Sequence, residues 1–390
     1  MNDPEGQVEP VSNPTWPPPA TPGRGIFRSG RFGGRPIKER SRKWYLGWFL
    51  ATFVTTTMAG AVHSGVDPFE RPWAMWVGLS FSLPLLAILL AHEFGHYFAA
   101  KYHGVGASLP LFIPAPPLLV GTFGAFIRLR DMPRSRRALF DVGAAGPWAG
   151  LLVALPVVAM GLHLSEVRPL DAAAGHGGLT LGSSLLFDWL SRRILGVDPE
   201  QATILLHPMA LAGWFGLFVT FLNLLPVGQL DGGHVVYALF GRSHQRIARV
   251  FFAIIFAMGF LGWQGWWLWC FLLLFVVKVD HPDTMDPETP LDPVRRFLAW
   301  LTIAAFVLTF MPVPLTAPDE SDDQSAIEQP AGTAGSARER DGMRRRAPSL
   351  PRAPAPGGRP DERQTPVLNI QLGEGTPPSA IPTAARRRPA

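Results

Sequence analysis

The chain has 390 residues, of which 47% are hydrophobic and only 17% are charged. Soluble domains carry about 25% charged residues, so this composition excludes an ordinary soluble globular protein and predicts an integral membrane protein. The formal net charge of +5 is small, and many basic residues lie near the two ends of the chain, so the charge does not indicate nucleic-acid binding.

Residues 1–43 are rich in Pro, Gly and Arg and lack apolar periodicity, which predicts a disordered basic arm. The apolar segment that follows, residues 45–61, ends in "AGA", which is similar to a signal-peptidase site. Because the preceding arm is much longer than the basic region of a signal peptide, we expect an uncleaved membrane anchor.

Seven apolar segments predict an all-α polytopic membrane protein with about six to seven transmembrane helices, because most have the roughly 20 residues needed to cross a bilayer. The segments are residues 45–61, 73–101, 138–162, 208–230, 247–262, 263–279 and 297–315. "GWQGWW" is expected to turn the chain between the fifth and sixth segments, with its tryptophans at the membrane interface. The basic clusters between segments fall on one side, which we take as cytoplasmic.

The long loop 163–207 then lies outside and contains a candidate amphipathic helix, "SLLFDWLSRRILG". Residues 316–390 are rich in Pro, Ala and charged residues and are expected to be disordered. The chain is therefore divided into an arm, a transmembrane core over residues 44–315, and a C-terminal tail. Adding or removing one span from the count would place the tail on the opposite side of the membrane.

The sequence "HEFGH", residues 92–96, lies in the second apolar segment. On a helix, positions i and i+4 share one face, so His92 and His96 can bind one metal ion, with Glu93 beside them. Ionisable groups inside a membrane span are costly and usually functional. This favours a catalytic metal site over the alternative of two interfacial histidines without a metal.

A catalytic zinc ion usually has three protein ligands and one open position. The candidate for the third ligand is Asp231, in "NLLPVGQLDGG" at the end of the fourth segment. At 1.5 Å per residue, His92 and Asp231 both lie about 30 Å along their segments, so they are expected at the same depth. The alternative for Asp231 is a turn residue that ends a helix before the Gly-Gly pair.

Together the two motifs resemble the site-2 protease family of intramembrane metalloproteases, whose pattern is HExxH followed by N-x-x-P-x-x-x-L-D-G in a later span. The second half is matched by Asn223, Pro226, Leu230, Asp231 and Gly232. "GTFGAFIRLR" and "GAAGPWAGL" are also similar to the family, and the resemblance covers residues 45–312. Some members of this family carry a PDZ or a CBS domain. Neither the 163–207 loop nor the tail fits such a domain, so the resemblance is to the compact members that lack both.

The resemblance implies one zinc ion per chain, with His92, His96 and Asp231 as ligands. It implies that Glu93 is the general base for attack by zinc-activated water on the scissile bond. Asn223 is similar to a family asparagine that helps to position substrate, and its amide would hydrogen-bond the substrate backbone or the developing oxyanion. Interhelical hydrogen bonding is the alternative role for Asn223.

A transmembrane helix shields its own peptide bonds, so a substrate must unwind before it is cut. "LVGTFGAFIRL", residues 119–129, combines β-forming residues with glycines, and we interpret it as a membrane-associated β-hairpin or re-entrant segment near the active site. Its candidate substrate strand is Gly121, Thr122, Phe123 and Gly124, which would hold unwound substrate by strand addition. A loop that plugs the bundle is the alternative, and the two roles are compatible.

Two further features lie near the motifs. The small residues of "GAAGPWAG", residues 143–150, are expected to let this segment pack closely against the catalytic helices. His234, which follows the Gly-Gly pair, is either a partner of a metal ligand or a solvated interfacial histidine.

The sequence therefore predicts an intramembrane zinc endopeptidase whose substrates, by resemblance, are single-span membrane proteins. One alternative is a zinc-binding membrane scaffold or pseudoprotease, against which the intact Glu93 argues because zinc binding does not require it. A metal transporter would need polar sites along a path through the membrane, and only one cluster is seen. We expect a multi-pass protein of a bacterial inner membrane with its active site toward the cytoplasm. The oligomeric state is not fixed by the sequence.

Overall fold

The computed structural model describes residues 40–130, 133–169, 180–197, 202–277, 279, 289–316 and 370–371. Nearly all of the predicted basic arm and most of the predicted tail lie outside these residues, so their disorder and the domain boundaries stay predictions.

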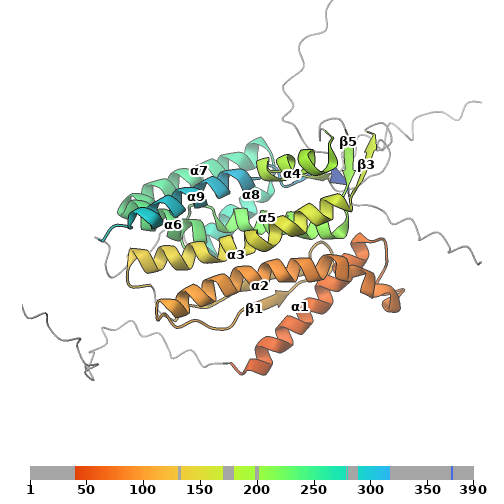
Figure 1. Ribbon diagram of the computed structural model, residues 1–390, viewed down its shortest axis with the longest axis horizontal. Coiled ribbons are helices and arrows are strands. Elements are labelled where there is room, and N and C mark those ends of the chain that lie inside the picture. The colour runs from red at the N-terminus through yellow and green to blue at the C-terminus, as the bar shows by residue number, and fades with distance from the viewer. Residues whose placement is uncertain are drawn as a thin grey trace, which may run out of the picture. The chain divides into compact units, whose positions relative to one another are not determined.

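Three long helices form the first half of the described chain. They are α1 (Arg42–His63), α2 (Leu79–Tyr102), which follows the 3-10 helix η1 (Pro72–Gly78), and α3 (Arg136–His163). Ser135 caps α3, because its hydroxyl accepts a hydrogen bond from the Ala138 N–H. α2 and α3 lie side by side over much of their length (Figure 1).

Two short strands follow α2 and lie beside α1. β1 (Leu111–Pro114) pairs antiparallel with β2 (Thr122–Phe126), with an irregularity in register after Ile113. The Thr55 hydroxyl donates to the Gly121 carbonyl at 2.6 Å, and Gly121 has a φ of +77°, which favours glycine. β2 lies within residues 119–129, where a hairpin or re-entrant segment was predicted, whereas β1 precedes them, and an association with a membrane stays a prediction.

The segment between α3 and the next long helix holds the amphipathic helix α4 (Leu185–Leu195). Its prediction is confirmed: Ser184 caps its start, and Gly196 ends it in the left-handed conformation. Five short strands flank it: β3 (Glu166–Pro169), β4 (Thr180–Leu181), β5 (Ala202–Leu205), β6 (Leu315–Thr316) and β7 (Ile370–Gln371). The β4–β6 pair joins this segment to the residues near the end of the described core.

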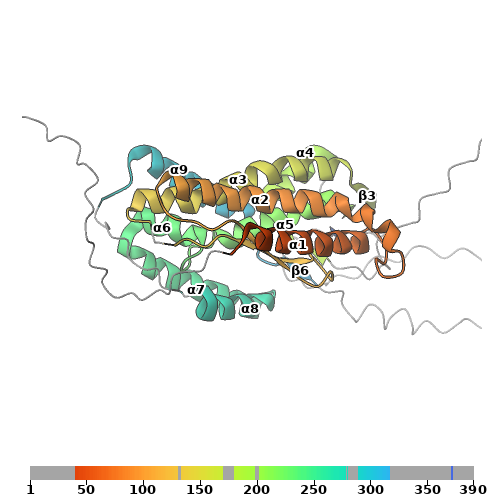
Figure 2. The same ribbon diagram turned by 90° about the horizontal axis from the view of Figure 1, so that it is seen from below.

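The second half contains shorter helices. They are α5 (Pro208–Asn223), α6 (Asp231–Phe240), α7 (His244–Leu261), α8 (Gly265–Leu272), which continues into a π-helix at Leu273–Val277, and α9 (Pro293–Thr309). α7 and α8 form the hairpin predicted at "GWQGWW" (Figure 2). α5 packs against α2 and α3, which places it in the middle of the bundle.

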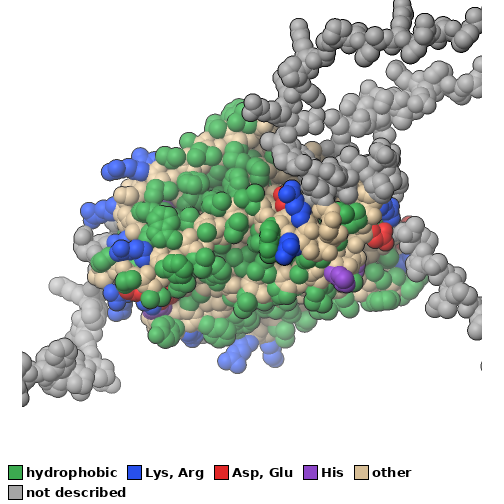
Figure 3. Space-filling model, turned by 45° about the horizontal axis from the view of Figure 1, so that its top comes forward, with side chains coloured by type: hydrophobic (Ala, Val, Ile, Leu, Met, Phe, Trp, Pro, Cys, Tyr) green, Lys and Arg blue, Asp and Glu red, His purple; other side chains and the backbone are tan. Residues whose placement is uncertain are grey.

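Within the described residues, four helical stretches are long and apolar enough to cross a membrane: Arg42–His63, Pro72–Tyr102, Arg136–His163 and Asp231–Leu261. Pro208–Asn223 and Gly265–Val277 are apolar but shorter. The chain is thus a mostly helical integral membrane protein, and the predicted count of six to seven spans is not established. In a space-filling view, hydrophobic side chains cover much of the face while many Lys and Arg side chains gather at one end (Figure 3).

Two details of the predicted spans are wrong. The fourth span was expected to run to residue 230 with Asp231 at its end, but α5 stops at Asn223 and Asp231 begins α6. Between them Leu224–Leu230 forms a buried loop with Gly228 at a φ of +57°. Trp266 was expected at the interface, but it is 0% exposed and donates its indole N–H to the Pro312 carbonyl.

The close contact between α1 and η1 depends on glycine. A Cβ on Gly60 would lie 2.4 Å from the Gly78 carbonyl oxygen, whereas a Cβ on Gly47, in the same helix, has nothing within 4 Å. We predict that Gly60→Ala lowers the free energy of unfolding by about 1–3 kcal/mol through overpacking, and that the melting temperature falls accordingly. Gly47→Ala is the matched control and should be neutral or slightly stabilising, because alanine favours helix. Equal melting temperatures for the two variants in the same detergent would contradict this packing.

Candidate active site

The "HEFGH" residues lie in the second half of α2, on a part of the helix that is covered by protein. His92, Glu93 and His96 are only 4%, 6% and 7% exposed. Asp231 reaches the same point from the first turn of α6, because the Leu224–Leu230 loop returns the chain after α5. Non-helical backbone at membrane depth is tolerated where protein covers it, as it is in this loop.

The three predicted ligand atoms meet. His92 Nε2 and His96 Nε2 are each 3.3 Å from Asp231 Oδ2, and the two ring nitrogens are 3.1 Å apart. Within the described residues, His92, His96 and Asp231 are the group whose ligand atoms could hold a metal ion. The structure therefore brings together two motifs that are more than 130 residues apart.

The protonation of the cluster fits a zinc ion. His96 Nδ1 donates to the Val142 carbonyl at 2.7 Å, which leaves its Nε2 as an unprotonated lone pair. Two ligands about 2.0–2.1 Å from a tetrahedral zinc ion are about 3.3 Å apart, which is close to the separations seen here. Lone pairs and a carboxylate at such distances repel one another unless a cation lies between them.

α3 shapes the site from behind. A Cβ on Gly146 would lie 2.0 Å from His96 Nε2, and one on Gly150 would lie 3.3 Å from the His92 ring. A Cβ on Gly143 would lie 2.7 Å from His234 Cβ. The predicted packing of "GAAGPWAG" against the catalytic helices is confirmed: Gly146 and Gly150 face the two metal-binding histidines, and Gly143 faces His234.

Glu93 is tied to the hairpin. The backbone N–H of Ile127, the residue after β2, hydrogen-bonds the Glu93 carboxylate. This bond orients the carboxylate while leaving its remaining lone pairs available. The candidate base and the candidate substrate strand are therefore held in one unit.

Asn223 lies at the last position of α5, and its Nδ2 is 3.2 Å from His92 Nε2. Its amide thus reaches the point that the three ligand atoms face. This agrees with either sequence interpretation, since the contact is an interhelical hydrogen bond that also places a donor at the site. The predicted role in substrate positioning stays a prediction.

A cavity of about 250 Å³ connects these groups. Its lining includes His92, Glu93, His96, Asn223, Gln229, Asp231 and His234, together with Ala125, Phe126 and Ile127 at the end of the hairpin. The cavity is thus bounded by the metal cluster on one side and by β2 on another. The more N-terminal strand candidates, Gly121 to Gly124, do not line this cavity.

Several groups at the site had no signal in the sequence. The Val142 carbonyl and the Ile127 N–H are backbone groups, so residue type does not reveal them. His103 lies in no recognisable sequence motif, but its Nε2 is 2.7 Å from Oδ2 of Asp141, the residue before Val142. For α3, the sequence signal was the spacing of the small residues at 143, 146 and 150, which predicted close packing against the catalytic helices.

The part of the chain that contains the metal cluster matches a known protein family. Residues 80–262 match the sequence model of Peptidase family M50. The chain carries a peptidase family M50 domain. The M50 match begins before His92 and extends past Asp231, so it contains every ligand candidate, and the predicted resemblance to site-2 proteases is confirmed.

Several plant proteins are similar to part of the chain. "Probable zinc metalloprotease EGY1, chloroplastic" of Arabidopsis thaliana is 32% identical over 237 residues, which are 60% of this chain and 43% of the relative. The protein of the same name from Oryza sativa subsp. japonica is 32% identical over 232 residues, 59% of this chain and 40% of the relative. "Probable zinc metalloprotease EGY2, chloroplastic" of Oryza sativa subsp. indica is 32% identical over 191 residues, 47% and 32% of the two chains.

The chain spans less than half of the length of these relatives. Their names describe zinc metalloproteases, which agrees with the donor set of the cluster. The names also place them in chloroplasts, so the comparisons do not support the bacterial inner membrane expected from the sequence.

The metal cluster predicts how zinc binding responds to substitution. Purified wild type should hold about one zinc ion per chain by elemental analysis, and Asp231→Ala and His96→Ala should lose most of it, because each removes one of three ligands. Glu93→Gln is the matched control and should keep its zinc, since it changes no ligand. Full zinc content in Asp231→Ala would mean that the third ligand is another residue.

The glycines of α3 predict a graded effect. Gly146→Ala should reduce zinc content markedly because the new methyl group overlaps the His96 ring, while Gly150→Ala should reduce it less because its contact is 3.3 Å. Gly47→Ala, with nothing within 4 Å, serves as the control in the same zinc measurement. Unchanged zinc content in Gly146→Ala would mean that α3 does not press on His96.

Proposed function

We propose that this chain is an intramembrane zinc endopeptidase that cleaves transmembrane segments of membrane proteins. The single observation that carries the proposal is the meeting of His92, His96 and Asp231 with Glu93 beside them in a buried cavity. The M50 match and the names of the relatives support the same chemistry.

His92, His96 and Asp231 would hold the zinc ion, which when bound supplies Lewis-acid chemistry that polarises a carbonyl and activates water. Glu93 is held by the Ile127 N–H at the rim of the same cavity. Its carboxylate is placed to accept a proton from the attacking water and to return it to the leaving amine. Because Glu93 is not a ligand, its protonation can change without loss of the cluster.

Asn223 would act on the substrate. Its amide N–H groups lie beside His92 Nε2, and a donor in this position can hydrogen-bond the scissile carbonyl as negative charge develops on it. With His92 Nε2 occupied by the zinc ion, the Asn223 amide would no longer donate to that nitrogen and would be available to the substrate. This role requires no movement of α5 beyond a rotation of the side chain.

The hairpin would present the substrate. β2 pairs with β1 along one edge, and its end reaches the cavity and the candidate base. An unwound substrate that added to β2 would run directly into the site, with its backbone hydrogen bonds supplied by the strand. Within the predicted stretch of Gly121 to Gly124, Gly121 is fixed against α1, so Thr122, Phe123 and Gly124 are the positions that belong to β2.

We propose that the partners are single-span membrane proteins and that nucleic acid is not among them. We place the site near the basic side of the membrane. His92 and His96 lie toward the end of α2 that carries Lys101, and Arg136 at the start of α3 donates to the Ala238 carbonyl in α6. Basic residues favour the cytoplasmic or equivalent side.

The alternative is a zinc-binding scaffold or pseudoprotease. It would need the three ligands but neither Glu93 nor a path for substrate to the cavity. The position of Glu93 beside the three ligands, at a cavity of about 250 Å³, supports the enzyme over the scaffold.

Cleavage of reporter helices tests the proposal. The full chain in lipid vesicles should cut a single-span reporter that carries Gly and Pro near its middle, and should cut a matched all-Leu reporter at least tenfold more slowly, because unwinding costs hydrogen bonds. Glu93→Gln should retain zinc and lower cleavage by about a thousandfold or more, since it removes the base. Mass spectrometry of the fragments locates the cut. Wild type that holds zinc but cuts no reporter would favour the scaffold.

A further inference from the structure

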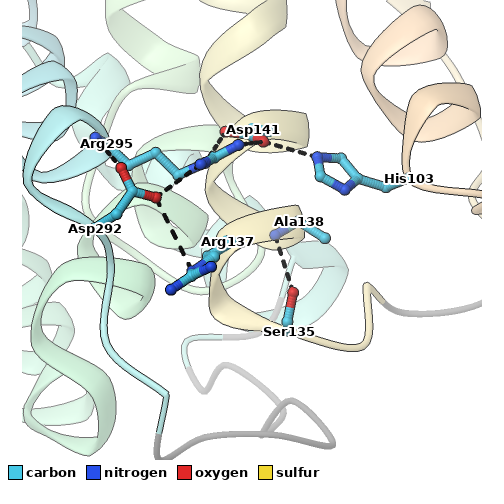
Figure 4. Close-up of polar contacts among 7 residues, drawn as sticks. All are labelled: His103, Ser135, Arg137, Ala138, Asp141, Asp292 and Arg295. Carbon is cyan, nitrogen blue, oxygen red and sulfur yellow. Dashed lines mark hydrogen bonds and ion pairs between the residues drawn. The ribbon is translucent and has the colours of Figure 1, made fainter. Parts of the chain in front are cut away.

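A second polar cluster lies near the metal site and is not part of it. Figure 4 shows Asp141, from α3, between Arg295 of α9 and His103, which follows α2. Arg295 donates to both Asp141 oxygens, from Nε at 2.8 Å and from a terminal nitrogen at 2.7 Å, and His103 Nε2 is 2.7 Å from Asp141 Oδ2. Arg295 also donates to Asp292 at 2.7 Å.

This arrangement is stronger than an ordinary surface ion pair. A bidentate guanidinium–carboxylate pair has two parallel charge-assisted bonds, which fix the direction of both groups. The side chains of Arg295 and Asp141 are only 30% and 21% exposed, so water and salt screen the pair less than an exposed one. It therefore adds a directional polar contact to the apolar packing between α9 and α3.

Asp141 lies next to the backbone group that orients a metal ligand. The following residue, Val142, accepts the hydrogen bond from His96 Nδ1. Partners of this kind fix the tautomer and direction of a metal-binding histidine. Contacts that fix the position of Asp141 therefore also fix the neighbouring Val142 carbonyl, which accepts the hydrogen bond from His96.

The start of α9 also touches the helix of the third ligand. A small apolar cluster joins Phe140 and Ala144 of α3, Val235 and Ala238 of α6, and Leu291 and Ala299 at or near the start of α9. α6 begins with Asp231. α9 is thus packed on both helices that complete the site around α2.

Apolar packing does not fasten α9 to α2 at this end. A groove of about 590 Å³ lies between α2, α3 and α9, and its walls include Phe98, Trp148 and Leu298. His103 and Asp141 line the same groove. The polar contacts of Asp141 therefore connect the end of α2 to α9 there, in addition to the apolar packing of each of these helices on α3.

We propose that Arg295 is a positioning residue for the metal site: through Asp141 it holds α3 so that the Val142 carbonyl stays against His96. His103 belongs to the same device, because it ties the end of the histidine-bearing helix to the same carboxylate. The inference rests on the metal site of the proposed function, and it concerns the geometry of that site.

Metal affinity separates this role from a purely stabilising one. Arg295→Gln and Asp141→Asn, in the full chain in detergent, should weaken zinc binding about tenfold in competition with a chromophoric chelator, as loss of an outer partner does. The absorption spectrum of Co²⁺ bound in place of zinc should change as well, since it reports ligand geometry. Arg296→Gln is the control, because Arg296 is the exposed neighbour and has no side-chain bond in the cluster among the described contacts.

Two further variants protect the test against loss of folding. Arg295→Lys keeps the positive charge but not the two parallel donors of the guanidinium group. Its affinity for zinc should lie between those of wild type and Arg295→Gln. Asp141→Glu keeps the carboxylate but moves it by one methylene, and should give an affinity between those of wild type and Asp141→Asn.

Two results would overturn the inference. Zinc affinity within twofold of wild type, with an unchanged Co²⁺ spectrum, in folded Arg295→Gln or Arg295→Lys would mean that the cluster only stabilises the bundle. Absence of zinc binding in wild type would overturn the proposed function, and the positioning role with it.

Discussion

Two imidazole nitrogens and one carboxylate oxygen meet within an apolar bundle, and the surrounding structure is arranged to keep them together. Burying such groups is costly unless a cation and hydrogen bonds compensate them. His96 donates from Nδ1 to the Val142 carbonyl, and the Asn223 amide lies beside His92 Nε2. The geometry of the cluster therefore depends on α3 and α5 as well as on the two helices that carry its ligands.

α3 packs directly against both metal-binding histidines although it contributes no metal ligand. Its glycines let it lie directly against the histidines, where a methyl group at Gly146 would overlap the His96 ring. Pro147 has no N–H to donate to the Gly143 carbonyl, which weakens the helix in the same turn. Close approach of the helix and a missing backbone hydrogen bond thus coincide at the metal site, about one and a half turns after Asp141.

The ligands could be predicted from sequence because helix geometry places i and i+4 on one face, and because a distal Asp is required to complete the set. The break between α5 and α6 could not, since "LLPV" is as apolar as a span and hydropathy does not distinguish a buried loop from a helix. Trp266 was misplaced because burial depends on tertiary packing. The Arg295–Asp141 pair joins residues far apart in the chain, and such contacts leave no local pattern.

The β4–β6 pair has a consequence for how the bundle can open. It fastens the chain just beyond α9 to the segment between α3 and α4, while Arg295 fastens the beginning of α9 to α3. A helix held at both ends cannot swing outward about either one. Outward movement of α9 would first have to break an ion pair or separate two strands, so α9 is anchored in the bundle at both of its ends.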